Sequence, residues 1–316
     1  MSLNKIYPKV LQKGDKIAFV SPAGSVSYQE KFEKAQAFFE NAGYSVVIMP
    51  NSRKINGYLA GDDEDRLEDL MSAFSDTSIN AIIANRGGYG CLRLLDKIDY
   101  NVIKNNPKIF VGYSDITALH CAFYKYAGLV TFHGAFSLDD FGCDEVDEYT
   151  KTSFFETLEG KNTNKPLENK FAYTSIVDAE VQAPLSGGNL TVLCSLLQTP
   201  YFPDLKGRVL FLEDVAEPLY KIDRMLYQLE LAGILGQIKG LLIGKFSGLC
   251  ENQTKAELLL FEMLEKLTSK YKIPAGYGFS AGHETSKATL PLNVEYYFNS
   301  LKGELKILEQ PVLFGH

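Results

Sequence analysis

Ser114 lies at a sharp turn between a predicted strand and a predicted helix, a position suited to a nucleophile. The apolar run 109–111 predicts a strand buried on both faces, and apolar side chains then recur at helical spacing from Ile116 to Tyr126. A serine hydroxyl at a helix N-terminus lies near free N–H groups, which favour a developing anion. Serine is also a common helix cap, and Ile116 stands where the G-x-S-x-G turn has its second glycine. The turn therefore indicates acyl transfer, with a simple cap as the alternative.

A glycine-rich loop follows the predicted strand 81–84 and reads Asn85-Arg86-Gly87-Gly88-Tyr89-Gly90. It is neither a P-loop nor a G-x-G-x-x-G fingerprint, so a nucleotide cofactor is not indicated. Adjacent glycines let a backbone N–H approach a reacting oxygen, and with the N–H of Asp115 they could form an oxyanion hole. A tight loop whose glycines only supply positive φ is equally compatible with the sequence.

A serine nucleophile needs a base, and histidine is the usual one. His120 lies six residues after Ser114 on the same predicted helix, about 240° around its axis, so we expect it to face away and be structural. His133 and His283 each follow an apolar segment at a plausible strand end. Spacing alone does not separate these two candidates.

The candidate acids are Glu213 and Asp214, which end the predicted strand 208–212. Side chains alternate along a strand, so the two carboxylates point to opposite faces and one can point toward the site. A solvated loop carboxylate is the alternative for Glu213.

Composition restricts the partners and the compartment. The 316 residues are 46% hydrophobic, with a net charge of −7, a pI near 5.3 and no basic block, which argues against nucleic acid and for a small molecule or peptide. Five cysteines without a C-x-x-C pair indicate neither a disulfide framework nor a metal site. No apolar run is long enough to span a membrane and no signal peptide is evident, so we expect a soluble cytoplasmic protein without membrane partners.

The elements predicted for the first half alternate, which favours an α/β fold with a Rossmann-like parallel sheet flanked by helices. Strands are expected at Lys16–Val20, Tyr44–Met49, 81–84, 109–111 and Leu129–Phe132. A helix after Val20 is expected to begin in a capping box of Ser27 and Glu30, and a short helix is expected at 92–98.

Two domains are expected from the length and from a polar stretch near the middle of the chain. We place an N-terminal α/β domain at 1–145, a linker at 146–178 and a C-terminal mixed α/β domain with antiparallel or barrel-like strands at 179–316. Ligands of open parallel sheets lie beyond the carboxyl ends of the strands, so the residues that directly follow the strands are the candidates for a site.

Five motifs in register resemble the LD-carboxypeptidases, a family of cytoplasmic serine peptidases that also includes the microcin C immunity peptidases. The resemblance spans about residues 13 to 308. The motifs are NRGGYG at 85–90, GYSDIT at 112–117, LSGGNL at 185–190, LEDVAEPLYKIDRML at 212–226, and GH at 282–283 followed by LPL at 290–292.

The resemblance implies a role for each candidate. Ser114 would be the nucleophile, His283 the general base and Glu213 the residue that orients it, with the N–H groups of Gly88 and Asp115 as oxyanion donors. His133 would then be structural.

The implied reaction is hydrolysis of the amide between an L-centre diamino acid, diaminopimelate or lysine, and the terminal D-alanine of a murein tetrapeptide during peptidoglycan recycling. Arg86 is a candidate partner for the D-alanine carboxylate. The chemistry requires no metal and no organic cofactor, and the resemblance implies a homodimer.

Two alternatives remain. A peptidase that cleaves aminoacyl-nucleotide antibiotics of the microcin type belongs to the same family, although the segment 213–218 and the absence of Trp resemble the murein type more closely. A non-catalytic two-domain small-molecule binding protein would show the same alternating sheet without needing Ser114, Glu213 and His283 to converge.

Overall fold

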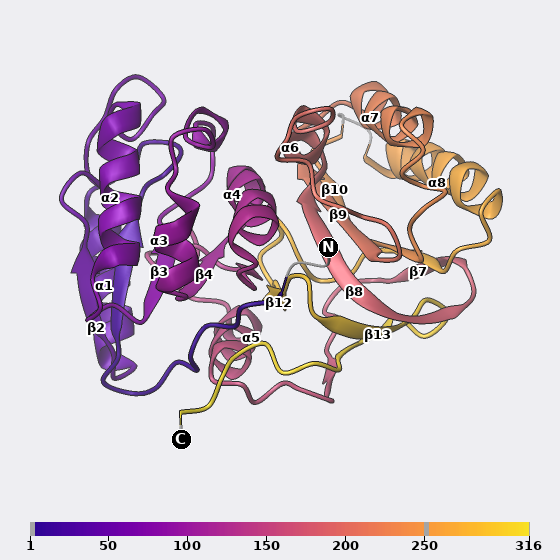
Figure 1. Cartoon of the computed structure of the whole chain (residues 1–316). Helices are drawn as coiled ribbons and strands as arrows, with labels where there is room; N and C mark the ends of the chain where they lie inside the picture. The colour runs from indigo at the N-terminus through magenta and orange to yellow at the C-terminus, as the bar shows by residue number, and fades with distance from the viewer. Residues whose placement is uncertain (1–3, 250–252, 316) are drawn as a thin grey trace.

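The computed structural model describes residues 4–249 and 253–315, which form two β-sheets side by side, each covered by helices (Figure 1). The strand order of the first sheet is β12-β5-β4-β3-β1-β2, and that of the second is β6-β14-β13-β8-β9-β10-β11-β7. The predicted mixed α/β architecture is confirmed.

The first sheet is parallel from β2 to β5 and ends in one antiparallel strand, β12. Its strands are β1 (Lys16–Val20), β2 (Ser45–Ile48), β3 (Ala81–Ala84), β4 (Ile109–Gly112), β5 (Phe132–His133) and β12 (Leu290–Pro291). β1, β3 and β4 are apolar runs because helices cover both faces. The right-handed crossover preference of such units brings the carboxyl ends of β3 and β4 to one edge, where the glycine loop and Ser114 follow.

The helices of the first half are α1 (Glu30–Asn41), α2 (Asp63–Ser75), α3 (Tyr100–Asn105), α4 (Thr117–Ala122) and α5 (Glu148–Leu158). Phe32 and Phe39 of α1 pack with Phe154 of α5 in the core on one face of the sheet. Leu70 of α2 and Leu119 of α4 pack in the core on the other face. The sheet is therefore sandwiched as the alternation predicts.

Three local predictions for the first half were wrong. α1 begins at Glu30 after an N-cap at Gln29, and no side chain caps it, so the predicted capping box does not form. The helix expected at 92–98 is only a 3₁₀ turn, Cys91–Arg93. The last parallel strand is β5 rather than Leu129–Phe132, so His133 lies within the strand and not after it.

The second sheet is mixed. Its strands are β6 (Pro166–Leu167), β7 (Thr174–Val177), β8 (Glu180–Asn189), β9 (Val209–Val215), β10 (Gly240–Ser247), β11 (Ala275–Tyr277), β13 (Glu295–Asn299) and β14 (Glu304–Ile307). β8 to β11 are parallel, whereas β6, β7, β13 and β14 pair antiparallel. The helices are α6 (Leu190–Ser195), α7 (Leu219–Leu231) and α8 (Gln253–Ser269).

The two sheets share one continuous apolar core. Leu119 of α4 belongs to the same cluster as Leu193 of α6 and Leu210 of β9. α4, the helix that follows Ser114, is in contact with α6 and β8. The core therefore fixes the nucleophile turn relative to the second sheet.

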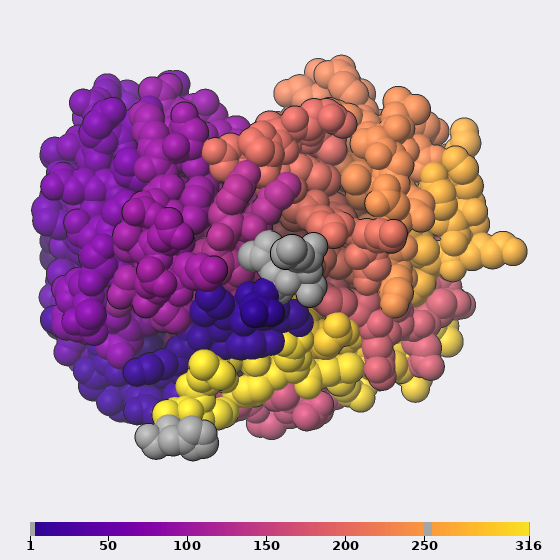
Figure 2. All heavy atoms as spheres, in the orientation of Figure 1, coloured from indigo at the N-terminus to yellow at the C-terminus, as the bar shows by residue number. Residues whose placement is uncertain are grey.

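The two ends of the described chain lie side by side, as the indigo and yellow segments in Figure 2 show. Lys9 forms a bridge with Leu313, and the backbone N–H of Val10 donates to the carbonyl of Leu313. The predicted domain limits remain a prediction; the range 146–178 holds α5, β6 and β7.

Within the described ranges, no helix combines the length and the apolar character needed to cross a membrane.

Candidate active site

The turn after β4 holds Ser114 in an unusual backbone conformation. Its φ is +59°, a left-handed value that costs a non-glycine residue on the order of 1–2 kcal/mol. Gly112 precedes it, and a Cβ there would lie only 2.8 Å from the Ile116 side chain. Strain at one non-glycine residue that the surrounding packing maintains is typical of a functional turn, and a simple cap does not require it.

Glu213 and His283 form a hydrogen-bonded pair. His283 Nδ1 lies 2.6 Å from Glu213 Oε2, and the Glu213 side chain is completely buried. Gly282 has φ +110°, and a Cβ at this position would lie 2.6 Å from the same carboxylate oxygen, so only glycine allows the approach. When Nδ1–H donates to the carboxylate, Nε2 is left to accept a proton.

The pKa of His283 is set by two opposing effects. Burial lowers the pKa, but the charge of Glu213 and its hydrogen bond outweigh burial and raise the pKa above its ordinary value. The imidazole also packs edge-on against the Tyr113 ring, with 4.9 Å between ring centroids. Position and basicity of the imidazole are thus set by residues of β9 and of the Ser114 turn.

The glycine loop lies directly against the serine. A Cβ on Gly87 would lie 2.7 Å from the Ser114 Cβ, so a side chain there would displace the serine. Gly88 has φ +105°, and a Cβ on it would lie 3.2 Å from the Cα of Gly24. The loop needs glycine for close approach as well as for positive φ.

These residues meet at a cleft of about 390 Å³. Of the predicted residues, Arg86, Gly88, Ser114 and His283 line the cleft, and Glu213 lies buried behind His283. Asp115 is buried and does not line it. The volume suits a small peptide rather than a large polymer.

Arg86 lines the cleft but is partly engaged elsewhere. Its Nη1 donates to the Ser25 carbonyl at 2.8 Å, and its Nε lies 3.8 Å from an Asp139 oxygen. The guanidinium therefore keeps donors for an anionic group while its position is fixed.

The structure brings His283 and not His133 to Glu213. His133 is buried between the Tyr113 and Phe211 rings, and neither of its ring nitrogens has a hydrogen-bond partner in the described parts of the chain. Burial lowers the pKa of His133 well below its ordinary value. His120 donates from Nε2 to the Gly112 carbonyl at 2.9 Å, in the structural position expected for it.

Sequence reasoning missed a polar cluster in the lining of the cleft. The Asp214 carboxylate accepts hydrogen bonds from Asn189 Nδ2, from the Thr191 N–H and from the Thr191 hydroxyl, at 3.0, 2.9 and 2.7 Å. All three residues line the cleft. The LSGGNL motif contains Asn189, but without a known pairing of β8 with β9 the motif carried no signal that its amide meets Asp214.

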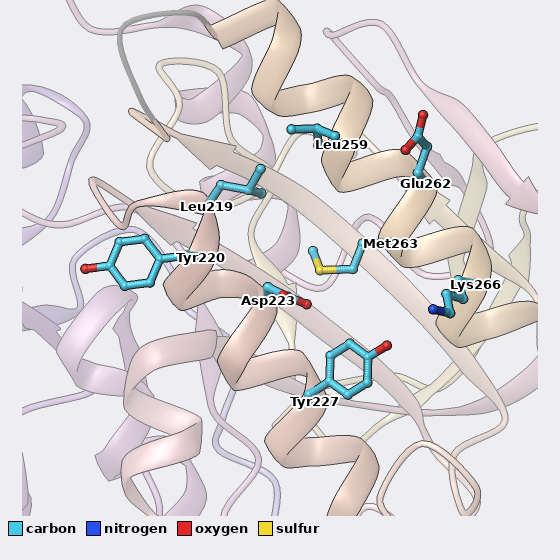
Figure 3. Close-up of a pocket in the computed structure, with 8 residues that line it drawn as sticks. All are labelled: Leu219, Tyr220, Asp223, Tyr227, Leu259, Glu262, Met263 and Lys266. Atoms are coloured by element: carbon cyan, nitrogen blue, oxygen red, sulfur yellow. The ribbon is translucent and has the colours of Figure 1, made fainter.

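A larger hollow of about 480 Å³ lies between α7 and α8, and its lining includes Tyr227 of α7 and Leu259 and Met263 of α8 (Figure 3). It shares no lining residue with the Ser114 cleft. Among the described residues, no group of three or more His, Cys, Asp or Glu side chains could hold a metal ion. Cys91, Cys121, Cys143 and Cys194 are free thiols, as expected, and Cys250 lies outside the described residues.

Two family models match the chain. The LD-carboxypeptidase N-terminal domain matches residues 17–134, and the LD-carboxypeptidase C-terminal domain matches residues 182–297. These ranges contain Ser114, and Glu213 with His283, respectively.

Relatives and solved structures agree with these matches. A probable murein peptide carboxypeptidase of Bacillus subtilis (strain 168) is 36% identical over 300 residues, which is 93% of this chain and 91% of the relative. The crystal structure of a muramoyltetrapeptide carboxypeptidase from Oxalobacter formigenes is 32% identical, with a TM-score of 0.81 over 94% of this chain and 100% of that chain.

The chain is also similar to microcin immunity proteins. The microcin C7 self-immunity protein MccF of Escherichia coli is 27% identical over 329 residues, 95% of each chain. A structure of MccF in complex with aspartyl sulfamoyl adenosine is 25% identical, with a TM-score of 0.87 over 98% of this chain and 100% of that chain. Both domain models and these full-length likenesses place the chain in the LD-carboxypeptidase family, as a serine-type carboxypeptidase hydrolase.

Proposed function

We propose that this enzyme releases the terminal D-alanine of a murein tetrapeptide, with Ser114 as nucleophile, His283 as general base and Glu213 as the residue that orients the base. The observation that carries the proposal is the 2.6 Å hydrogen bond between His283 and the buried Glu213, behind a cleft that Ser114 and His283 both line. The three residues are far apart in sequence, and a fold without this chemistry has no need to gather them.

The reaction proceeds in two balanced halves. His283 Nε2 takes the Ser114 hydroxyl proton as Oγ attacks the carbonyl carbon of the diamino acid, and the oxyanion accepts hydrogen bonds from the N–H groups of Gly88 and Asp115. The C–N bond breaks, and His283 gives the proton to the D-alanine amine. A water that gives its proton to His283 Nε2 then attacks the acyl carbon, the ester C–O bond breaks, and His283 returns the proton to Ser114 Oγ as the shortened peptide leaves with a free carboxylate.

The charges that line the cleft support a diamino-acid substrate. Three carboxylates, Asp139, Asp214 and Glu217, line it beside one guanidinium, Arg86. Lys31 pairs with Asp139 at 3.0 Å and Lys221 pairs with Glu217 at 3.1 Å, whereas Asp214 accepts hydrogen bonds from the neutral Asn189 and Thr191. Arg86 would receive the carboxylate of the leaving D-alanine, and the Asp214 carboxylate would favour an amino group on the acyl side. An aspartyl group, as on the MccF ligand named above, would meet repulsion there.

The proposal includes a cytoplasmic role in peptidoglycan recycling and a homodimer, both implied by the resemblance. It excludes nucleic acid and membrane as partners on the net charge of −7 and the absence of a basic block. Analytical ultracentrifugation would give the oligomeric state directly. If the protein is a monomer, the expected homodimer is wrong, and the proposed reaction mechanism is unaffected.

The test offers the purified enzyme the tetrapeptide L-Ala-γ-D-Glu-diamino acid-D-Ala, with diaminopimelate or lysine at the third position, and an aspartyl-nucleotide phosphoramidate in parallel. We expect free D-alanine from the tetrapeptides at a rate well above that of nucleotide release. An enzyme that cleaves the aspartyl-nucleotide faster would instead be of the microcin type. No D-alanine from either tetrapeptide would refute the proposed substrate.

A further inference from the structure

One peptide unit beyond the glycine loop is held at both of its polar atoms by buried charged side chains. Arg66 Nη1 donates to the Gly90 carbonyl at 3.0 Å, and the N–H of Cys91 donates to Asp115 Oδ2 at 2.8 Å. Arg66 is 1% exposed and Asp115 is 2% exposed. Gly90 and Cys91 share this peptide bond, so the two side chains clamp it from both ends.

The clamp is well suited to hold a loop of glycines in place. Gly88 and Gly90 have φ values of +105° and +139°, and glycine on its own leaves the backbone free to adopt many conformations. The other end of the loop is held by the N–H of Gly24, which donates to the Gly87 carbonyl at 3.0 Å. The N–H of Gly88 shares a peptide unit with the Gly87 carbonyl, so Gly24 holds this unit directly and the clamp at Gly90 and Cys91 holds the far end of the loop.

An ionised carboxylate holds a backbone N–H more strongly than a neutral acceptor does. A hydrogen bond to an ionised acceptor is about twice as strong as a neutral one, and an ionised carboxylate has to be compensated when it is buried. Burial raises the pKa of Asp115 above its ordinary value, and the bonds from Cys91 and the charge of Arg66 oppose this shift without reversing it. Arg66 in turn is held by the Pro22 carbonyl at 2.6 Å, so the cation is fixed in place.

We propose that the Asp115 side chain is a positioning residue that fixes the oxyanion-binding N–H of Gly88 relative to the N–H of Asp115 itself. One residue would then supply a donor through its backbone and set the place of the second donor through its carboxylate. The inference rests on the proposed serine mechanism. It goes beyond that mechanism because it assigns a task to the side chain of Asp115 and to Arg66.

The test measures D-alanine release by Asp115→Ala and Asp115→Asn, each rate divided by the concentration of active sites titrated with a fluorophosphonate. The matched control is Asp69→Ala. Asp69 is a 3% exposed carboxylate that accepts the Asn51 N–H at 3.0 Å and does not line the cleft. Asp69→Ala shows what is lost in general when a buried carboxylate that accepts a backbone N–H is removed, so any further loss in Asp115→Ala is specific to Asp115.

We expect Asp115→Ala to lower kcat per titrated site about 100-fold with little change in KM, the size seen when one oxyanion donor is lost. Asp115→Asn keeps an acceptor oxygen but loses the charge, so it should lose about three- to tenfold. Asp69→Ala should keep the parental kcat per site. A purely structural Asp115 would lower the number of active sites and leave the rate per site unchanged.

If Asp115→Ala does not fold, a second experiment with milder substitutions tests the same inference. Arg66→Lys acts on the same peptide unit from its carbonyl side, so Arg66→Lys combined with Asp115→Asn should lose less than the product of the two single losses. Equal per-site rates for the parent, Asp115→Asn and Arg66→Lys would overturn the inference. A parent enzyme that neither reacts with the fluorophosphonate nor releases D-alanine would instead overturn the proposed mechanism.

Discussion

At the scale of single residues, the Glu213 carboxylate determines what the His283 imidazole can do. Burial alone would keep the imidazole neutral and weakly basic, as it does for His120, whose pKa it lowers to about 4. The carboxylate 2.6 Å away reverses this direction for His283. The same ring type thus has opposite basicity at two buried positions because only one of them has an anionic partner.

Removal of the nucleophile gives the simplest prediction. Ser114→Ala should lower turnover by about three orders of magnitude or more, because the attacking oxygen is lost while the fold is retained. D-alanine release and thermal unfolding of the purified variant are the two measurements. Near-parental turnover would remove Ser114 from the mechanism.

Glu213→Gln should change the pH profile as well as the rate. His283 must be neutral to act as a base, so activity of the parent falls as pH drops through the raised pKa of His283. Without the negative charge, burial dominates and the acid limb should move to lower pH, while kcat falls by roughly 10³ to 10⁴. An acid limb that stays in place in the variant would mean that another group titrates.

The titration of His283 should affect stability in the opposite direction to activity. A raised pKa in the folded state means that protonated His283 stabilises the fold below its unfolded pKa, and that this contribution is lost as pH rises through the folded pKa. The difference in unfolding free energy between the parent and Glu213→Gln should therefore be larger at acid pH than at alkaline pH.

At the scale of elements, two strand-to-helix junctions meet and position the site. Ser114 follows β4 and begins the turn into α4, and Asn189 ends β8 before α6. They are joined where the Asn189 N–H donates to the Thr117 hydroxyl at 3.0 Å. A Cβ on Gly188, whose φ is +141°, would lie 2.5 Å from that hydroxyl oxygen.

Gly188→Ala should therefore lower both stability and kcat, because the new methyl group pushes α4, and with it the Ser114 turn, away from β8. The matched control is Gly207→Ala, where φ is +72° and a Cβ would meet nothing within 4 Å. That change should destabilise by about 1 kcal/mol from backbone strain alone and leave the rate per active site unchanged. Equal behaviour of the two variants in thermal unfolding and in kcat would contradict the close packing of the junctions.

At the scale of the whole molecule, α4 joins the two sheets. Leu119 of α4 is fully buried in the core that also contains Leu193 and Leu210 of the second sheet's elements. Since Ser114 belongs to one sheet and Glu213 to the other, the cleft exists only while this shared core is intact.

Leu119→Ala should lower the free energy of unfolding by about 3 kcal/mol, from the lost transfer energy and the cavity it leaves. The control is Leu258→Ala, at a position that is 61% exposed, which should change stability by less than about 0.5 kcal/mol. Urea titration followed both by circular dichroism and by D-alanine release makes the comparison. Loss of D-alanine release at a much lower urea concentration than loss of the circular dichroism signal would mean that the two sheets separate before either one unfolds.

Much of the first sheet could be predicted because its local patterns agree with its tertiary role. β1, β3 and β4 are continuous apolar runs, and Gly128 ends the helical region with φ +74°, as a C′ glycine should. The capping box of Ser27 and Glu30 failed because α1 begins two residues later, with Gln29 as its N-cap and the Gln29 side chain donating to the Val26 carbonyl. β12 was not predicted, since two residues from the far end of the chain give no periodicity.

The sequence by itself determined the residue types of the site, the Ser114 turn, the glycine loop and, through the order of five motifs, the family. Local spacing left His283 and His133 open and the resemblance favoured His283, which the structure shows against Glu213. Only the tertiary structure decided that Asp214 turns to Asn189 and Thr191, and that Asp115 and Arg66 clamp one peptide unit. Local patterns report which side chains are apolar and where the chain turns. Contacts between residues 23 to 70 positions apart depend on strand order and on a shared core, which no local window of sequence contains.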